Sequence, residues 1–289
     1  MAHVLGVIGG SGLYAMEDLT DVEEIEVDTP WGAPSDALIR GRLDGREIVF
    51  LPRHGRGHVL LPTEVPYRAN LWAMRKLGVR WVLSISAVGS LREAVEPGHL
   101  VVVDQFVDRT RGRPSTFFGG GCVAHVQLGD PICGTLRGML LEAARGAVDT
   151  TIHDGGTYVC MEGPQFSTRA ESELYRGWGA DVIGMTNVPE CKLAREAEIS
   201  YATLALSTDY DCWHTGHDEV SVEAVVATVK ANVAAAQRVI RALLPQVAAY
   251  GGPVPKAQQA LAGAIMTAPD RISAEARARL GLLIDPHVG

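Results

Sequence analysis

The chain has 289 residues and carries 26 Lys and Arg against 34 Asp and Glu, which gives a net charge of −8 at pH 7. This acidic balance argues against nucleic acid or an anionic membrane surface as the partner. Hydrophobic residues make up 47% of the chain and charged residues 21%, which excludes general disorder. A chain of this length can bury a large core without disulfides.

Residues 1–12 read as a strand that runs into a glycine loop, not as a signal peptide. The sequence contains no run of about 18 apolar residues, so we expect no transmembrane helix. The five cysteines are odd in number and form no CxxC pair, so neither a zinc site nor a disulfide framework is indicated. We therefore expect reduced thiols and a cytoplasmic location.

Strands and helices alternate along the chain. An apolar run at 4–8 enters a glycine loop, and two strands at 37–43 and 47–52 flank the hairpin signal Asp44-Gly45. The further predicted elements are helix 67–77, strand 80–86, strand 100–106, helix 135–147, strand 156–162, helix 170–177, strand 181–185, helix 189–197, strand 201–208 and helix 222–244. This alternation predicts an α/β fold: a single domain with a central mixed β-sheet flanked by helices.

The composition changes at residues 250–255, where Gly and Pro indicate a short linker. We therefore expect a main domain at 1–249, and a linker and C-terminal helical appendage at 250–289 packed on the same domain. Short helices are predicted at 260–266 and 273–283. The alternative is a tail that caps a neighbouring subunit.

The loop after the first strand fits the pattern G-x-G-x-x-A from Gly10 to Ala15, a loose form of the dinucleotide fingerprint. The next segment does not support a nicotinamide cofactor. Residues 13–19 are too short for a crossover helix, and residues 20–28 are acid-rich without a second apolar strand. We favour an anion loop, in which backbone N–H groups and the Ser11 hydroxyl hold one phosphate or sulfate. A turn without a ligand stays open at this point.

Two further strand ends carry groups suited to an anion. Arg53 and His54 follow one strand, where Arg offers a planar fork of donors and His another donor. Ser86 and Ala87 follow the next, where small residues let backbone N–H groups approach a ligand. Each feature alone could be a surface salt bridge or a turn. Together they predict a ligand crevice at the carboxyl ends of the sheet.

Several later loops carry groups suited to a nucleoside base. Phe166 precedes Ser167 in a turn and could stack on a base, although it could also fill the core. Asp209 and Asp211 end another strand at positions i and i+2. Such carboxyls can titrate as a coupled pair, and one could keep a proton to donate. They could equally be solvated loop acids or a helix cap.

Taken together, these motifs resemble the methylthioadenosine phosphorylases of the trimeric purine nucleoside phosphorylase family. The resemblance runs from about residue 7 to residue 244, and the tail beyond residue 250 matches poorly. It is carried by VIGGSGLY at 7–14, DTPWGAPSDAL at 28–38, LPRHGRGH at 51–58, SAVGSLRE at 86–93, DQFVDRT at 104–110, MEGPQFSTRAES at 161–172, GADVIGMTNVPE at 179–190 and STDYDCW at 207–213.

The resemblance implies a role for each matching residue. The implied phosphate-binding residues are Ser11, Arg53, His54, Ser86, Ala87 and Thr186. The implied nucleoside-binding residues are Met185 beside the ribose, Phe166 and Ser167 beside the base, Asp209 and Asp211 at the adenine, Val222 and Val225 at the methylthio group, and His125 lent by a neighbouring subunit. The implied assembly is a homotrimer. Inorganic phosphate is the implied co-substrate, without a metal or another cofactor.

The chemistry of these residues agrees with phosphorolysis of 5′-methylthioadenosine. A phosphate held beside C1′ needs little further entropy loss to attack, and a protonated Asp209 can neutralise the leaving purine with support from Asp211. One alternative is a 6-oxopurine nucleoside or methylthioinosine phosphorylase, because relatives that act on 6-oxopurines carry Asn at the position of Asp209. A non-catalytic adenine-nucleoside binding protein and a nicotinamide dehydrogenase are the alternatives from other classes.

Overall fold

The computed structural model describes residues 3–214 and 222–288, and leaves out the side chains of residues 11, 222–227 and 229. The strands are β1 (Leu5–Gly9), β2 (Thr20–Ile25), β3 (Leu38–Leu43), β4 (Arg46–Pro52), β5 (Trp81–Ser90), β6 (Leu100–Val102), β7 (Gln105–Arg109), β8 (Ile152–Asp154), β9 (Thr157–Met161), β10 (Val182–Gly184) and β11 (Ser200–Tyr210). The α-helices are α1 (Tyr67–Lys76), α2 (Gly134–Ala147), α3 (Arg169–Gly177), α4 (Asn187–Glu196), α5 (Val222–Ala248) and α6 (Ala274–Val288). None of these helices is both long and apolar enough to cross a membrane.

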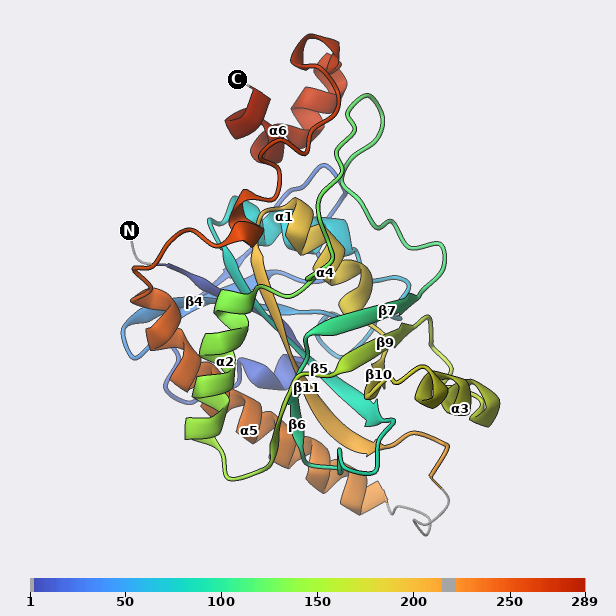
Figure 1. Ribbon diagram of the computed structural model, residues 1–289. Coiled ribbons are helices and arrows are strands. Elements are labelled where there is room, and N and C mark those ends of the chain that lie inside the picture. The colour runs from blue at the N-terminus through green and yellow to red at the C-terminus, as the bar shows by residue number, and fades with distance from the viewer. Residues whose placement is uncertain (1–2, 215–221, 289) are drawn as a thin grey trace.

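The strands form one mixed sheet in the order β2-β3-β4-β1-β5-β10-β9-β7, and β11 joins it between β5 and β6. β1 lies between β4 and β5, parallel to both, while β10 runs antiparallel to β5. The helices lie around this sheet, with α2 and α5 together on one side (Figure 1). The α/β fold with a central mixed sheet is thus confirmed.

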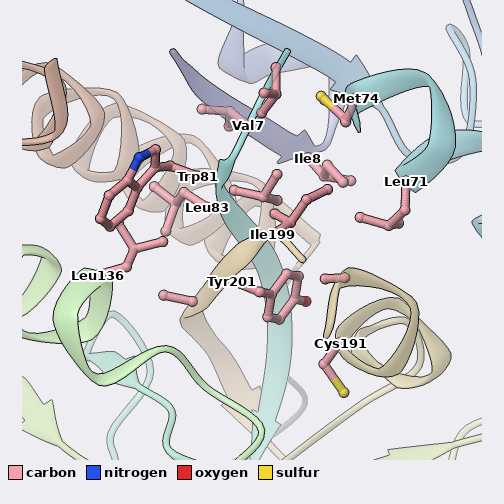
Figure 2. Packing of buried hydrophobic residues seen from close by; sticks show 14 of the residues in the cluster. Val7, Ile8, Leu71, Met74, Trp81, Leu83, Leu136, Cys191, Ile199 and Tyr201 are labelled. Atoms are coloured by element: carbon pink, nitrogen blue, oxygen red, sulfur yellow. The ribbon is translucent and has the colours of Figure 1, made fainter. Parts of the chain in front are cut away.

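The centre of the sheet is apolar on both faces. Every residue of β1 is buried, as expected for a strand covered by helices on both sides. Figure 2 shows Trp81 and Leu83 of β5 on the side of Leu136 from α2, while Tyr201 of β11 points toward Cys191 of α4. The alternation of side chains along each strand therefore supplies two apolar layers, one for each set of helices.

Two predicted elements differ from the structure, and the edge strand β2 was not predicted. The strand expected at 100–106 is divided, because β6 pairs with β11 and β8 whereas β7 pairs with β9. The acid-rich stretch near residue 20 contains β2, whose residues are mostly exposed, and such an edge strand tolerates charge. The helix expected at 260–266 is wrong: Ile265 there pairs with Ala124 in an isolated bridge.

The C-terminal segment contacts the rest of the chain at several points. The Gln258 side chain donates to the Arg80 carbonyl oxygen at 3.0 Å, and Arg80 donates to the Gln258 carbonyl oxygen at 2.8 Å. Leu261 is fully buried. Farther on, α6 agrees with the helix expected at 273–283, and it lies beside the loop that precedes α2 (Figure 1).

Candidate functional site

The ends of three neighbouring parallel strands meet at one edge of the sheet. Gly9 at the end of β1 is in register with Pro52 of β4, and the Arg53 amide donates to the Gly9 carbonyl oxygen at 2.9 Å. Ser86 lies on β5, the strand on the other side of β1. After β1 the chain makes only a short 3-10 helix, Ser11–Leu13, so the crossover helix of a dinucleotide fold is absent here. The Ser11 side chain lies outside the described residues.

The Arg53 side chain is only 3% exposed and lies in a network that the sequence did not reveal. Its Nε and Nη2 donate to the two carboxylate oxygens of Glu190 at 2.8 and 3.2 Å. Nη2 also donates to Ser84 Oγ at 2.6 Å. Glu190 is fully buried and accepts from Ser84 and from the Tyr201 hydroxyl at 2.6 and 2.8 Å. The planar fork expected to hold phosphate therefore faces Glu190.

The Arg53 guanidinium stays charged in this setting. Burial disfavours the charged form, but the Glu190 carboxylate outweighs it, and the pKa of Arg53 is raised above its ordinary value. Nη1 donates to the Ile85 carbonyl oxygen at 3.0 Å, which uses one of its two hydrogens. The other Nη1 hydrogen is the donor that these contacts leave for an anion.

The His54 ring is half-buried and stacks on the His58 ring, with centroids 4.3 Å apart. Its Nδ1 lies 2.8 Å from the Leu60 carbonyl oxygen. Burial, with a smaller contribution from the charge of Arg53, lowers the pKa of His54 to about 4. The ring is therefore neutral at pH 7, with its single hydrogen on Nδ1. The sequence suggested that His54 donates a hydrogen bond to an anion, but this hydrogen is used by the Leu60 carbonyl oxygen.

Ser86 and Thr186, two further residues of the predicted phosphate pocket, lie close to one tyrosine. Both side chains are buried. The Tyr158 hydroxyl lies 3.2 Å from Ser86 Oγ and forms a hydrogen bond with the backbone of Thr186. Ala87, the next residue of β5, is exposed. Tyr158 therefore connects two residues that are 100 positions apart in the chain, and it carries no signal in the sequence that could have revealed this.

The two aspartates lie at the end of β11, beside the same strand β5. The pairing of β11 with β5 shifts register between Ser207 and Asp209, which makes Thr208 the extra residue of a β-bulge. A Cβ at Gly89 would lie 3.3 Å from Asp209 Oδ1, so this glycine leaves room for the carboxyl group. The bulge thus directs Asp209 toward the strand that carries Ser86.

The two carboxyl groups have different surroundings. Burial is the main cause that raises the pKa of Asp209, the charge of Asp211 adds to it, and a 2.6 Å hydrogen bond from Thr208 opposes it. Asp211 is 8% exposed, and its Oδ2 is buried without a hydrogen-bond partner among the described residues. A carboxyl group with a raised pKa and an unsatisfied acceptor suit the polar edge of a purine.

The loop that carries Phe166 and Ser167 lies next to these aspartates. The Ser167 carbonyl oxygen accepts from the thiol of Cys212, the residue after Asp211, at 3.3 Å. Phe166 is 81% exposed, so its ring projects outward and is not packed in the core. The loop position agrees with a base-side role, whereas the stacking of Phe166 on a base stays a prediction.

Arg113 holds this loop against the residue predicted to lie beside the ribose. Its Nη1 donates to the Met185 carbonyl oxygen at 2.7 Å, and its Nη2 to the Glu162 carbonyl oxygen at 2.6 Å. A Cβ at Gly163 would lie 2.6 Å from the Met185 sulfur, so this position needs glycine. Arg113 is 9% exposed, and no motif in the sequence distinguished it.

His125 lies apart from the other candidate residues. Its amide donates to the Ala264 carbonyl oxygen at 2.9 Å, and its side chain borders a hollow of about 900 Å³ between the start of α2 and residues 255–264. None of the other candidate residues with described side chains lines this hollow. Val222 and Val225 lie in the first turns of α5, where the side chains are outside the described residues.

The described residues contain no group of three or more His, Cys, Asp or Glu that could hold a metal ion. They contain five free cysteines, of which Cys212 is exposed and the others are buried.

Comparison with known proteins shows the family of the chain. The family model described as Phosphorylase superfamily matches residues 4–245. An S-methyl-5′-thioadenosine phosphorylase of Geobacter sulfurreducens is 58% identical over 289 residues, which covers 100% of both chains. One of Thermosynechococcus vestitus is 57% identical over 290 residues, again over 100% of both.

Solved structures of methylthioadenosine phosphorylases are also similar to this chain. A methylthioadenosine phosphorylase from an antarctic soil metagenomic library has a TM-score of 0.94 and 49% identity, and the match covers 98% of this chain and 99% of that one. A methylthioadenosine phosphorylase from Schistosoma mansoni in complex with tubercidin has a TM-score of 0.82 and 36% identity, with 89% and 95% covered. The first relatives align with the whole chain, including the tail beyond residue 250, whereas the family model ends at residue 245.

Proposed function

The chain belongs to the phosphorylase superfamily, and we propose that it catalyses the phosphorolysis of 5′-methylthioadenosine to adenine and 5-methylthioribose 1-phosphate. The observation that carries this proposal is the placement of Asp209, a carboxyl with a raised pKa, beside the strand that holds the phosphate-pocket residue Ser86. An anion and the base of one nucleoside can then occupy the same crevice.

The reaction needs charge of both signs to be stabilised. Inorganic phosphate, the proposed co-substrate, lies among Ser11, Arg53, His54, Ser86, Ala87 and Thr186 and attacks C1′ of the sugar. The C1′–N9 bond breaks, and its electron pair goes to the purine. Asp209 delivers its proton to the purine at N7, while Asp211 supports the polar edge of the base. No step requires a metal ion.

The remaining candidate residues position the nucleoside. Phe166 and Ser167 contact the base, Met185 contacts the ribose, and Val222 and Val225 surround the methylthio group. His125 is lent to the site of a neighbouring subunit in a homotrimer. His125 lines a hollow that none of the other candidate residues with described side chains reaches, which supports this arrangement. Sedimentation should find a trimer, and a fully active monomer would contradict the shared site.

We also propose that residues 1–249 form the catalytic domain, with 250–289 as its appendage. The contacts of Gln258 and Ile265 with the main body support this division. The free state of all five cysteines supports a cytoplasmic location, where thiols stay reduced.

Product chromatography with and without phosphate tests the reaction. Adenine should form from 5′-methylthioadenosine only when phosphate is present, and cleavage without phosphate would identify a hydrolase. A parallel assay on inosine and methylthioinosine distinguishes the oxopurine alternative. We expect much slower turnover of both, because relatives that act on 6-oxopurines carry Asn at the position of Asp209.

A further inference from the structure

The His54 ring is held in one orientation by its own loop. The backbone carbonyl oxygen of His54 accepts from the amides of Val59 and Leu60 at 3.0 and 3.1 Å. The ring atom Nδ1 contacts the Leu60 carbonyl oxygen at 2.8 Å. A carbonyl oxygen can only accept, so Nδ1 must carry the hydrogen of this contact. In a neutral ring the other nitrogen, Nε2, then has a lone pair and no hydrogen.

The charged groups around the ring keep it neutral. Arg53 is the preceding residue and bears a buried positive charge, and His58 stacks on the ring with an interplanar angle of 15°. Glu190 on α4 carries the nearby negative charge, but it is paired with Arg53 at 2.8 Å. A second positive charge at His54 would be partly buried and would face Arg53. Nε2 is therefore a hydrogen-bond acceptor, whereas the neighbouring Arg53 guanidinium offers only donors.

An acceptor of this kind distinguishes between tetrahedral anions. Monohydrogen phosphate carries one P–O–H group, which can donate a hydrogen bond, whereas sulfate carries none. We propose that His54 binds the phosphate by accepting the hydrogen of its P–O–H group at Nε2, and that this contact selects phosphate over sulfate. The proposal rests on the proposed phosphorolysis, because that function places phosphate beside His54.

The same contact provides a path for the proton of the attacking phosphate. When a phosphate oxygen forms its bond to C1′, the C1′–N9 bond breaks and the purine takes a proton from Asp209. The new ester still carries the P–O–H hydrogen, which is now acidic with a pKa of about 6. Nε2 accepts this hydrogen in a hydrogen bond until the proton leaves to solvent, because a charged ring would be partly buried beside Arg53. Asp209 regains a proton from solvent, so the net change moves one proton from phosphate to adenine.

Calorimetric titration with inorganic phosphate and with sulfate at pH 8, where both anions are divalent, tests the proposal. His54→Asn keeps an N–H group that can donate to the Leu60 carbonyl oxygen and removes the Nε2 atom. The preference for phosphate over sulfate should fall by about 10-fold to 100-fold, which is the value of one hydrogen bond with a charged partner. The matched control is His58→Asn. It makes the same replacement on the stacked ring, at a residue with φ of 57° that Asn tolerates well, and it should keep the preference.

An unchanged phosphate-to-sulfate ratio in His54→Asn would overturn the proposal. A second measurement does not depend on how that variant folds: ¹⁵N-histidine NMR of the wild-type chain at pH 7 should show Nε2 of His54 without a hydrogen, and a protonated Nε2 would also overturn it. Failure of the proposed function is a separate result. It would appear as a wild-type chain that selects phosphate yet leaves 5′-methylthioadenosine intact.

Discussion

The phosphate end and the base end of the site are built in opposite ways. At the phosphate end, Arg53 and Glu190 are both buried and are joined through Ser84 and Tyr201 into one hydrogen-bonded network. At the base end, the carboxyl of Asp209 stands at a β-bulge, and the neighbouring loop carries Phe166 with 81% of its surface exposed. One end is therefore formed before the ligand arrives, whereas the other end is open.

The difference follows from what each end must stabilise. Donors that hold an anion work best when they are fixed in place and shielded from water, and a network of buried charges achieves this. The base end must admit a flat purine and supply a proton, and the raised pKa of the Asp209 carboxyl favours its protonated form. Arg53 has an opposite charge beside it, while the groups that face Asp209 are the Thr208 hydroxyl and another carboxyl.

Proton donation by Asp209 at the base end should have the largest effect on activity. Asp209→Asn should lower kcat for 5′-methylthioadenosine by about 100-fold to 10,000-fold, because an amide cannot transfer a proton to the leaving purine. Steady-state assays at saturating phosphate measure the effect. The exposed Asp270 provides a control, since Asp270→Asn should leave kcat unchanged. An unchanged rate in Asp209→Asn would remove its role as the acid.

The network at the phosphate end can be broken at Glu190. Glu190→Gln leaves the Arg53 charge buried without its partner, so the free energy of unfolding should fall by about 3 to 5 kcal/mol. In the folded variant the KM for phosphate should rise more than kcat falls, because Arg53 is no longer held in position. Urea denaturation and phosphate titration measure the two effects.

The matched control for Glu190→Gln is the exposed pair between Glu24 and Arg56, which is also joined by two hydrogen bonds, at 2.6 and 2.8 Å. Glu24→Gln should change stability much less, since exposed ion pairs contribute little. Equal losses in the two variants would show that burial of the Arg53–Glu190 pair does not matter.

The hydrogen bond from Thr208 to Asp209 lowers the pKa of this carboxyl group. Thr208→Val keeps the shape of the side chain and removes the donor that stabilises the ionised carboxyl, so the pKa of Asp209 should rise further. Activity that depends on protonated Asp209 is lost as the pH rises through this pKa. The falling limb of the pH profile of kcat should therefore move to higher pH in the variant, and a shift to lower pH would contradict the assignment.

The smallest expected effect is on stability. Because burial raises the pKa of Asp209 in the folded state, the folded chain binds this proton more tightly than the unfolded chain. Wild-type stability should then decline as the pH rises from the unfolded pKa through the raised folded pKa. Asp209→Asn lacks this decline and should be slightly more stable than wild type at neutral pH and no more stable at acidic pH. Thermal melts at both pH values measure it.

Much of the sheet could be predicted because its central strands are short apolar runs bounded by glycine or polar residues. Leu5–Gly9 and Ser200–Tyr210 are of this kind, and the predicted strands lie within a residue or two of them. The edge strand Thr20–Ile25 was missed because an exposed strand needs no apolar pattern. The predicted helix at 260–266 failed because Ile265 is placed by a bridge to Ala124, a contact between distant residues.

The sequence by itself determined the candidate site residues, since hydroxyls, Arg53, His54 and the two aspartates follow predicted strands in motifs with specific spacing. Only the tertiary structure decided how these groups are charged and held. Glu190, Tyr158 and Arg113 reach the site from distant elements, and burial, not local sequence, shifts the pKa values of His54 and Asp209. Local sequence can place a residue at the end of a strand, whereas desolvation and the partners of a charge depend on the whole fold.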